Sequence, residues 1–236
     1  MGRQWLQKHR EINAARRARI NTKLLREVSM AAKSGVPDPT LNPRLAVAVE
    51  AAHKQSVPGD RITRAIKKGA GLLEEKLELE HVLFEGFAPH RVPVMVECLT
   101  DNRNRTAPEI RVLFRKGQLG VRVSFLFDHV GIVEATHPDR SLDLETVAIE
   151  AGAQNVEPLA PAPEEGTGGR FLTEPADLDA VTKAIVNAGF TVTVSEMGYV
   201  PKQPMDLPAE ARQEVEEFLE ALDDNEDVHR IHTALR

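Results

Sequence analysis

The stretch Glu97–Thr106 most constrains what this chain can fold into, because it joins a buried-strand pattern to a helix-start pattern. The apolar run Val92–Val96 leads into it and predicts a buried strand. Thr106 and Glu109, three residues apart, form a capping-box pattern that predicts the start of a helix over about residues 107–116. The sequence therefore predicts a strand, a polar loop and a helix in direct succession.

The loop between this strand and this helix carries a dense cluster of polar side chains: Asp101, Asn102, Arg103, Asn104 and Arg105. Binding residues concentrate on loops that a rigid scaffold positions. Two guanidinium groups beside a helix N-terminus also suit an anion such as phosphate. The alternative is a tight loop held by Asx turns, with its arginines in water. The loop is therefore a candidate second contact for a polyanion, or a domain-orienting element.

Charge is divided unevenly along the chain. Residues 1–70 carry 15 Lys and Arg against 5 Asp and Glu, a net charge of +10, whereas the remaining residues carry 15 against 31, a net charge of −16. A basic end joined to an acidic body predicts that the N-terminal third binds a polyanion such as nucleic acid. The alternative is that these cations only decorate exposed helix faces.

The basic N-terminal third has helical periodicity throughout. An apolar stripe covers residues 5–33, Asn42 and Pro43 fit the N-cap and first position of a second helix, and Gly69 ends a third. Residues 1–75 are therefore predicted to form a basic helical bundle. Its outward-facing cations are the candidate nucleic-acid-binding residues: Lys8, Arg10, Arg16, Arg17, Arg19, Lys23, Arg61, Arg64, Lys67 and Lys68.

The chain after the bundle mixes strand and helix patterns. Strands at 82–87 and 92–99, the capped helix, and a hairpin of 121–127 with 131–135 follow in an order that points to a ferredoxin-like unit. This unit still lacks a second helix and a last strand. The acidic helix 209–222 and the strand-like end of the chain can supply them.

We therefore predict an α+β fold with a third domain inserted in the second. A further α/β pattern lies between the hairpin and the acidic helix. The predicted parts are a basic helical bundle at 1–75, an α/β domain at 76–135 plus 201–236, and an inserted α/β domain at 136–200, the last two of the ferredoxin-like type.

Composition excludes several classes of protein. The single cysteine, Cys98, excludes an intrachain disulfide and a multi-cysteine metal cluster. The eight histidines are scattered without metal-ligand spacing, so we expect no metal and no other cofactor. No apolar run is long enough to span a bilayer, and the N-terminus lacks the apolar core of a secretory signal. We expect a cytoplasmic protein without a membrane partner.

Several motifs, in order along the whole chain, resemble those of the YebC/PmpR family. The most specific of them is Glu97–Thr106. The others are Lys8-His9-Arg10, Thr22-Lys23-Leu24, Pro37-Asp38-Pro39, Asn42-Pro43, Ala65–Gly69, Glu85-Gly86-Phe87 and Val123–Phe127.

This resemblance implies a bacterial or organellar protein with a helical first domain and a third domain inserted in the second. It implies a transcriptional regulator that binds DNA, or a translation factor that acts on the ribosome and relieves stalls at proline-rich stretches. No enzymatic activity is implied. The sequence departs from the family at Asn21, where Phe is usual, and in the shortened loop 116–122, which indicates a divergent paralogue.

Three classes of function are consistent with these features. The favoured one is a non-enzymatic regulator that binds duplex DNA through the basic helical domain, with structured RNA or the ribosome as the alternative partner. A metal-dependent nuclease would need converging carboxylates, for which the candidates are Glu97, Asp101, Asp128 and Glu134. We favour instead that Glu97 pairs with a nearby arginine and that Asp101 caps the loop. A protein-interaction module would use the acidic helix within 210–227.

Overall fold

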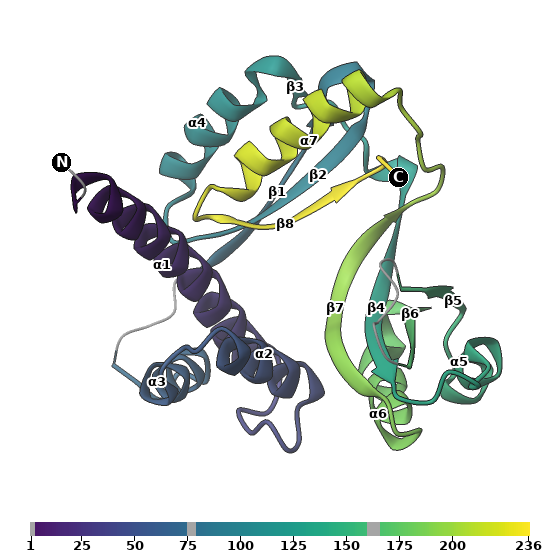
Figure 1. The fold of residues 1–236 in the computed structure, drawn as a ribbon. Coiled ribbons are helices and arrows are strands. Elements are labelled where there is room, and N and C mark those ends of the chain that lie inside the picture. Colours follow the sequence, from purple (N-terminus) through teal and green to yellow (C-terminus); the bar gives the residue numbers. More distant parts are fainter. Residues whose placement is uncertain (1–2, 75–78, 160–165) are drawn as a thin grey trace.

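The computed structural model describes residues 3–74, 79–159 and 166–236, except the side chains of residues 3–13, 15 and 16. Three units lie around a common centre (Figure 1), and a cavity lined from all three occupies this central hollow. The predicted fold class is confirmed, because a helical unit precedes two separate four-stranded sheets that carry their own helices. Within the described residues, no helix is both long and apolar enough to cross a membrane.

The helical unit consists of α1 (Arg3–Ser34), α2 (Pro43–Lys54) and α3 (Gly59–Gly69). As predicted, Asn42 caps α2, because its side-chain oxygen accepts a hydrogen bond from the Leu45 N–H at 3.1 Å. The Asn42 amide also donates to the Ala31 carbonyl at 3.0 Å, which fixes α2 against α1. The core of the unit is aliphatic: Val28, Ala32, Leu45, Ala48, Ala52, Ile62 and Ala65.

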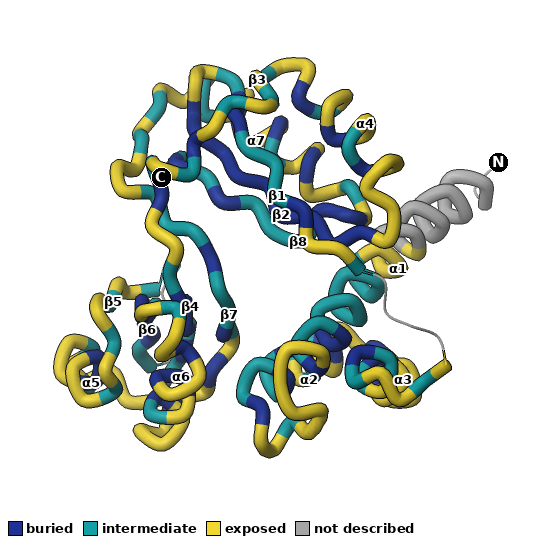
Figure 2. The backbone as a smooth tube through the Cα atoms, turned by 180° about the vertical axis from the view of Figure 1, so that it is seen from behind, coloured by how far each residue is buried: buried dark blue, intermediate teal, exposed yellow. Residues whose placement is uncertain are grey.

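The first sheet has the strand order β3-β1-β2-β8, and two helices cover one of its faces (Figure 1). Its elements are β1 (Glu80–Phe87), β2 (Pro93–Thr100), β3 (Gln118–Leu119), β8 (Val228–Thr233), α4 (Arg103–Leu113) and α7 (Ala209–Asp223). β1 and β2, both predicted as strands, pair antiparallel, and β8 from the end of the chain pairs with β2. Figure 2 shows β2 buried along its whole length, consistent with its place between β1 and β8 inside the sheet.

The second sheet has the strand order β5-β6-β4-β7. Its elements are β4 (Phe127–His137), α5 (Leu144–Ala151), β5 (Asn155–Pro158), β6 (Thr167–Thr173), α6 (Leu178–Asn187) and β7 (Thr191–Pro201). This βαββαβ succession, with its first and third strands at the centre, is the ferredoxin-like arrangement. The ferredoxin-like arrangement predicted for the first sheet unit is wrong, because the consecutive strands β1 and β2 lie at its centre. The core of the second unit includes Val133, Phe171, Leu178, Ile185 and Phe190.

The hairpin predicted at 121–127 and 131–135 is wrong. The Glu85 carboxylate accepts hydrogen bonds from the N–H groups of Val123 and Ser124, both at 2.8 Å, and turns the chain into a short 3-10 helix. β4 begins only at Phe127 and pairs with β6 and β7 of the second sheet. The division into three domains stays a proposal; β4, most of which the predicted bounds 76–135 assign to the second domain, belongs to the second sheet.

A long antiparallel ribbon of β4 and β7 joins the two sheet units. Near the first sheet, Phe127 and Tyr199 from this ribbon pack in one apolar cluster with Met95 of β2. The face of the first sheet that carries no helix is therefore covered partly by the ribbon. The rest of that face lines the hollow between the three units.

Candidate nucleic-acid interface and domain junction

The basic side of α1 lies against the acidic C-terminal end of α7. Lys23 Nζ is 2.8 Å from Asp223 Oδ1, and Arg19 Nη1 is 3.8 Å from Asp224 Oδ1. Lys23 also donates to the backbone carbonyl of Asp223, at the end of α7 where the helix dipole is negative. Two of the predicted nucleic-acid contacts, Arg19 and Lys23, are therefore paired with acids of the same chain.

Asp227, which directly precedes β8, joins α1, the polar loop and α4. Its carboxylate accepts hydrogen bonds from Thr106 Oγ1 at 2.6 Å, Arg105 Nη2 at 2.9 Å and Arg26 Nη1 at 3.0 Å. Burial alone would raise the pKa of Asp227, but the hydrogen bonds and the two guanidinium charges hold it below its usual value. One buried carboxylate thus links the polar loop to the helical unit.

Helix α4 begins earlier than predicted and has a different cap. Asn102 Oδ1 accepts a hydrogen bond from the Arg105 N–H at 3.2 Å, so α4 starts at Arg103. Thr106 is buried inside the helix, and its hydroxyl donates to Asp227. The predicted capping box of Thr106 with Glu109 is wrong, because the buried carboxylate engages the Thr106 hydroxyl.

Five of the predicted cations lie on the described surface of the helical unit away from α7. Arg17, Arg61 and Lys67 are exposed, and in the described part of the chain their side chains make no hydrogen bond or ion pair. Arg64 is exposed and Lys68 is half-buried, and each interacts with another group. This surface therefore offers free cations at both α1 and α3.

The remaining predicted site residues fall into two sets. Lys8, Arg10 and Arg16 belong to α1, but their side chains lie outside the described residues. In the polar loop, Arg103 and Asn104 are exposed at the first turn of α4. Both arginines are exposed, but the Arg105 guanidinium also reaches the buried Asp227 carboxylate, whereas Arg103 does not.

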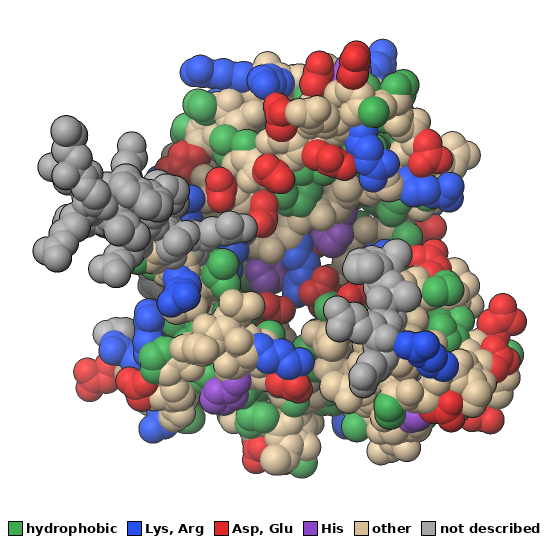
Figure 3. All heavy atoms as spheres, in the orientation of Figure 1, with side chains coloured by type: hydrophobic (Ala, Val, Ile, Leu, Met, Phe, Trp, Pro, Cys, Tyr) green, Lys and Arg blue, Asp and Glu red, His purple; other side chains and the backbone are tan. Residues whose placement is uncertain are grey.

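Arg230 of β8 bridges the three units. Its Nη2 is 2.9 Å from Glu27 Oε1 on α1, and it also pairs with Glu196 on β7. Burial raises the pKa of Glu196, and the charge of Arg230 opposes this shift. A cavity of about 230 Å³ lies at this junction and is lined from α1, α2 and both sheets. Figure 3 shows acidic, basic and histidine side chains inside the hollow.

Glu97 holds two histidines in this junction. Its Oε2 is 2.7 Å from His81 Nε2, and its Oε1 is 2.7 Å from His232 Nε2. His232 Nδ1 accepts the Tyr199 N–H, so Nε2 carries the ring proton and donates to Glu97. Burial alone would raise the pKa of Glu97, but the hydrogen bonds from both histidines hold it far below its usual value. The expected pairing of Glu97 with an arginine is wrong.

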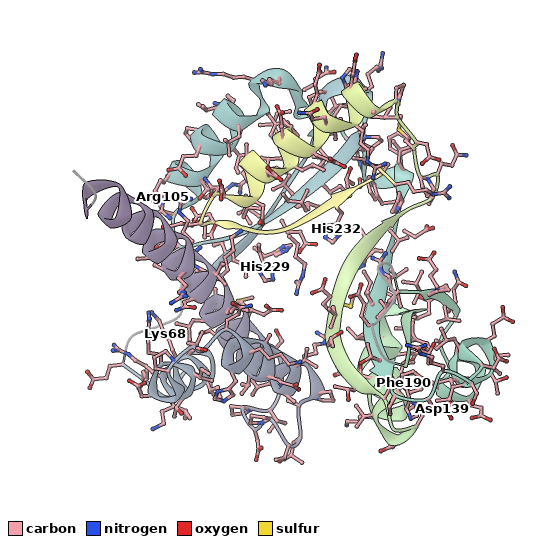
Figure 4. All side chains as sticks on the ribbon, in the orientation of Figure 1. Lys68, Arg105, Asp139, Phe190, His229 and His232 are labelled. Atoms are coloured by element: carbon pink, nitrogen blue, oxygen red, sulfur yellow. The ribbon has the colours of Figure 1, made fainter. Side chains whose placement is uncertain are left out.

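His229 extends from β8 into the same hollow (Figure 4). It contributes to the lining of all three cavities that meet there. Burial, followed by the charge of Arg230, lowers the pKa of His229 to about 3. The imidazole is therefore neutral at physiological pH.

The four carboxylates considered for a nuclease do not converge. Asp128 and Glu134 lie on one strand, six residues and thus about 20 Å apart. Asp101 pairs with Arg105 in the polar loop, and Glu97 is held by histidines. Among the residues that the structure describes, no group of three or more His, Cys, Asp or Glu could hold a metal ion.

Asp227, Arg230 and His229 organise this junction, although the sequence patterns did not single them out. The one indication of this junction in the sequence was the uneven division of charge between the first third and the rest of the chain. A basic first third and an acidic remainder can pair with one another as readily as the basic part can bind an external polyanion. The acids that end α7 are the intramolecular partners in this case.

Two family models match nearly the whole chain. Residues 2–72 match the TACO1/YebC protein N-terminal domain, and residues 79–235 match the TACO1/YebC second and third domain. The chain therefore belongs to the TACO1/YebC family, as its motifs indicated.

Individual relatives are similar over their full length. A "probable transcriptional regulatory protein" of Pseudomonas syringae pv. tomato is 51% identical over 238 residues, which cover 100% of this chain and 99% of the relative. A protein of the same description from Bdellovibrio bacteriovorus is 44% identical over 239 residues and covers 100% of both chains. The crystal structure of a conserved hypothetical protein from Aquifex aeolicus matches with a TM-score of 0.77 and 36% identity, over 93% of this chain and 90% of that one.

Proposed function

We propose that this protein is a non-enzymatic regulator that binds duplex DNA through its basic helical unit. The relatives named as transcriptional regulatory proteins support the regulatory role. One observation carries the DNA contact: in the described part of the chain, Arg17, Arg61 and Lys67 are exposed without a side-chain partner on α1 and α3. The acidic remainder of the chain would repel the phosphate backbone and so direct it to this unit.

The composition of the helical unit favours contacts with the backbone over contacts with bases. Trp5 is the single aromatic residue in positions 1–70, so stacking of unpaired bases has little support. Lys and Arg side chains that meet phosphates release counterions, and the affinity then falls steeply with salt. We therefore expect weak sequence dependence and strong salt dependence.

The test is a salt series of fluorescence anisotropy with a labelled DNA duplex. Arg61→Glu combined with Lys67→Glu is expected to weaken binding at least tenfold and to flatten the salt slope by roughly 2. The matched control is Lys183→Glu combined with Arg236→Glu, which changes the net charge equally at exposed sites of the other units. Absence of binding by the unmodified protein, or equal losses in both variants, would overturn the proposal.

The alternative is a translation factor that binds structured RNA on the ribosome and relieves stalls at proline-rich stretches. Phosphate contacts position a protein without reading sequence, so the same cations could serve either polymer. Ribosomal RNA and intact ribosomes belong in the same salt series. Tighter binding to ribosomes than to duplex DNA at equal salt would favour the alternative.

A further inference from the structure

A second set of cations lies on the first sheet unit, around the outer side of α4. Arg103, Arg111, Arg115 and Lys116 are all exposed. Among the described residues, their side chains form no ion pair or hydrogen bond, in contrast to Arg19 and Lys23 of α1. The segment from Arg103 to Arg122 contains six Arg and Lys but only one acidic residue, Glu109. Arg105 is paired with Asp227, but the charges of Arg103, Arg111, Arg115 and Lys116 are not neutralised by any ion pair within the described residues.

The helix presents these cations on the side away from α7. Thr106, Ile110 and Phe114 are buried, and their spacing of four residues marks the inner side of the helix. Arg111 of α4 and Arg115 of the short 3-10 helix that follows it (Phe114–Lys116) each come one position after a buried residue, so both lie off the buried side of this segment. The single acid of the segment, Glu109, instead accepts a hydrogen bond from Asn225 beyond α7.

The two helices of this sheet face differ sharply in charge. The stretch from α7 to Asp227 contains nine acidic residues and one arginine. Figure 3 shows acidic side chains over α7 and Lys or Arg side chains over the C-terminal end of α4. A polyanion would therefore be attracted to α4 and repelled by α7, which restricts how it can lie on this face.

We infer that the α4 basic face, formed by Arg103, Arg111, Arg115 and Lys116, is a second docking surface for the backbone of duplex DNA. The inference rests on the proposed DNA binding and adds a contact outside the helical unit. Charge complementarity supports it, since the cations are exposed and unpaired within the described residues. The aromatic side chain of this segment, Phe114, is buried, so the face has no platform for stacking single-stranded bases.

The experiment compares paired variants of the full chain on one labelled DNA duplex. Arg111→Glu with Arg115→Glu should weaken binding at least tenfold and reduce the salt slope by roughly 2, whereas Lys183→Glu with Arg236→Glu should change the affinity less than twofold. Arg111→Gln with Arg115→Gln should also weaken DNA binding, but less than the Glu variant does. Thermal unfolding of each variant confirms that the exposed substitutions leave the fold intact.

The outcomes separate this inference from the proposed function. If the unmodified protein does not bind duplex DNA, both fail. If it binds, and Arg61→Glu with Lys67→Glu weakens binding while the α4 variants match the control, the α4 docking surface alone is overturned. Loss of binding in the α4 variants with structured RNA but not with duplex DNA would overturn the assignment of DNA as its partner.

Discussion

Arg26 of α1 and Asp227 before β8 lie with Nη1 and Oδ1 3.0 Å apart, although 201 positions separate them in the chain. The Arg26 guanidinium also donates to the carbonyls of Leu99 and Glu226, at 3.1 and 2.7 Å. Three acceptors around one guanidinium fix the angle at which α1 leaves the first sheet unit. The helical unit is therefore held in place by specific polar contacts with β2 and with the two residues before β8.

Replacing Asp227 with Asn should lower the free energy of unfolding by about 2–4 kcal/mol, because two guanidinium groups lose a buried countercharge. The Asp227 side chain is only 3% exposed. Asp223→Asn is the matched control, since its ion pair with Lys23 is largely exposed and should contribute less than about 1 kcal/mol. Urea unfolding followed by circular dichroism gives both values, and equal stability of the two variants would contradict the role of Asp227.

Much of the secondary structure follows from local sequence patterns, because caps and helix ends depend on residues a few positions apart. Asn42 and Pro43 start α2 as the capping pattern predicts, and Gly69 is the last residue of α3. Val121–Phe127 shows why alternation can mislead. Its apolar spacing fits a strand, but Glu85 binds the backbone of Val123 from 38 positions away. A contact at that separation cannot be read from a window of neighbouring residues.

The sequence predicts which residue types form the candidate site, but not which groups they contact. The sequence identifies Arg19, Lys23 and Arg105 as cations near a potential anion site, but it does not indicate which anion they meet. In the folded chain that anion is a carboxylate from the last 15 residues. Arg103 remains exposed because two positions along α4 turn its side chain by about 200° from that of Arg105, a difference that depends on where α4 starts.

The stability of the protein should fall as the pH decreases from about 6.5 towards 3, partly through His229. Its pKa is lowered from 6.5 to about 3, so the unfolded chain takes up a proton that the folded chain excludes in this range. The slope from one such group reaches about 1.4 kcal/mol per pH unit. His229→Gln should flatten the dependence, measured as urea midpoints across this range, and an unchanged slope would contradict the role of His229.

His81 affects the pH dependence of stability in the opposite direction to His229 and over a different pH range. The hydrogen bond that the protonated His81 ring donates to the Glu97 carboxylate raises the pKa of His81 above 6.5. Its stabilisation is therefore complete below pH 6.5 and is lost as the pH rises through the raised pKa. His81→Gln should lower stability near pH 6 and have less effect near pH 9. A larger loss at the higher pH would contradict the ion pair.

Arg230→Gln should loosen the packing of the three units around the hollow. Glu196 would lose its countercharge in a buried setting, and Glu27 would lose its link to β8. If the packing of the units against one another is weakened by about 1–2 kcal/mol, forms in which the units have separated become five to thirty times more populated. Limited proteolysis should accelerate by a similar factor. Arg170→Gln is the control, because Arg170 pairs with Glu134 inside the second sheet; equal acceleration in both variants would contradict a junction role for Arg230.

Gly69→Ala should destabilise the helical unit, because α3 approaches α1 too closely there for any side chain. A Cβ at Gly69 would lie 2.1 Å from the backbone oxygen of Ser29, and backbone cannot move aside cheaply. We expect a loss of about 1–3 kcal/mol from this overpacking. Gly59→Ala, at the other end of α3, meets nothing within 4 Å and should be neutral or stabilising by about 0.4–1 kcal/mol. Calorimetric melting of both variants tests the contact, and a Gly69→Ala protein as stable as Gly59→Ala would show that the two helices lie further apart.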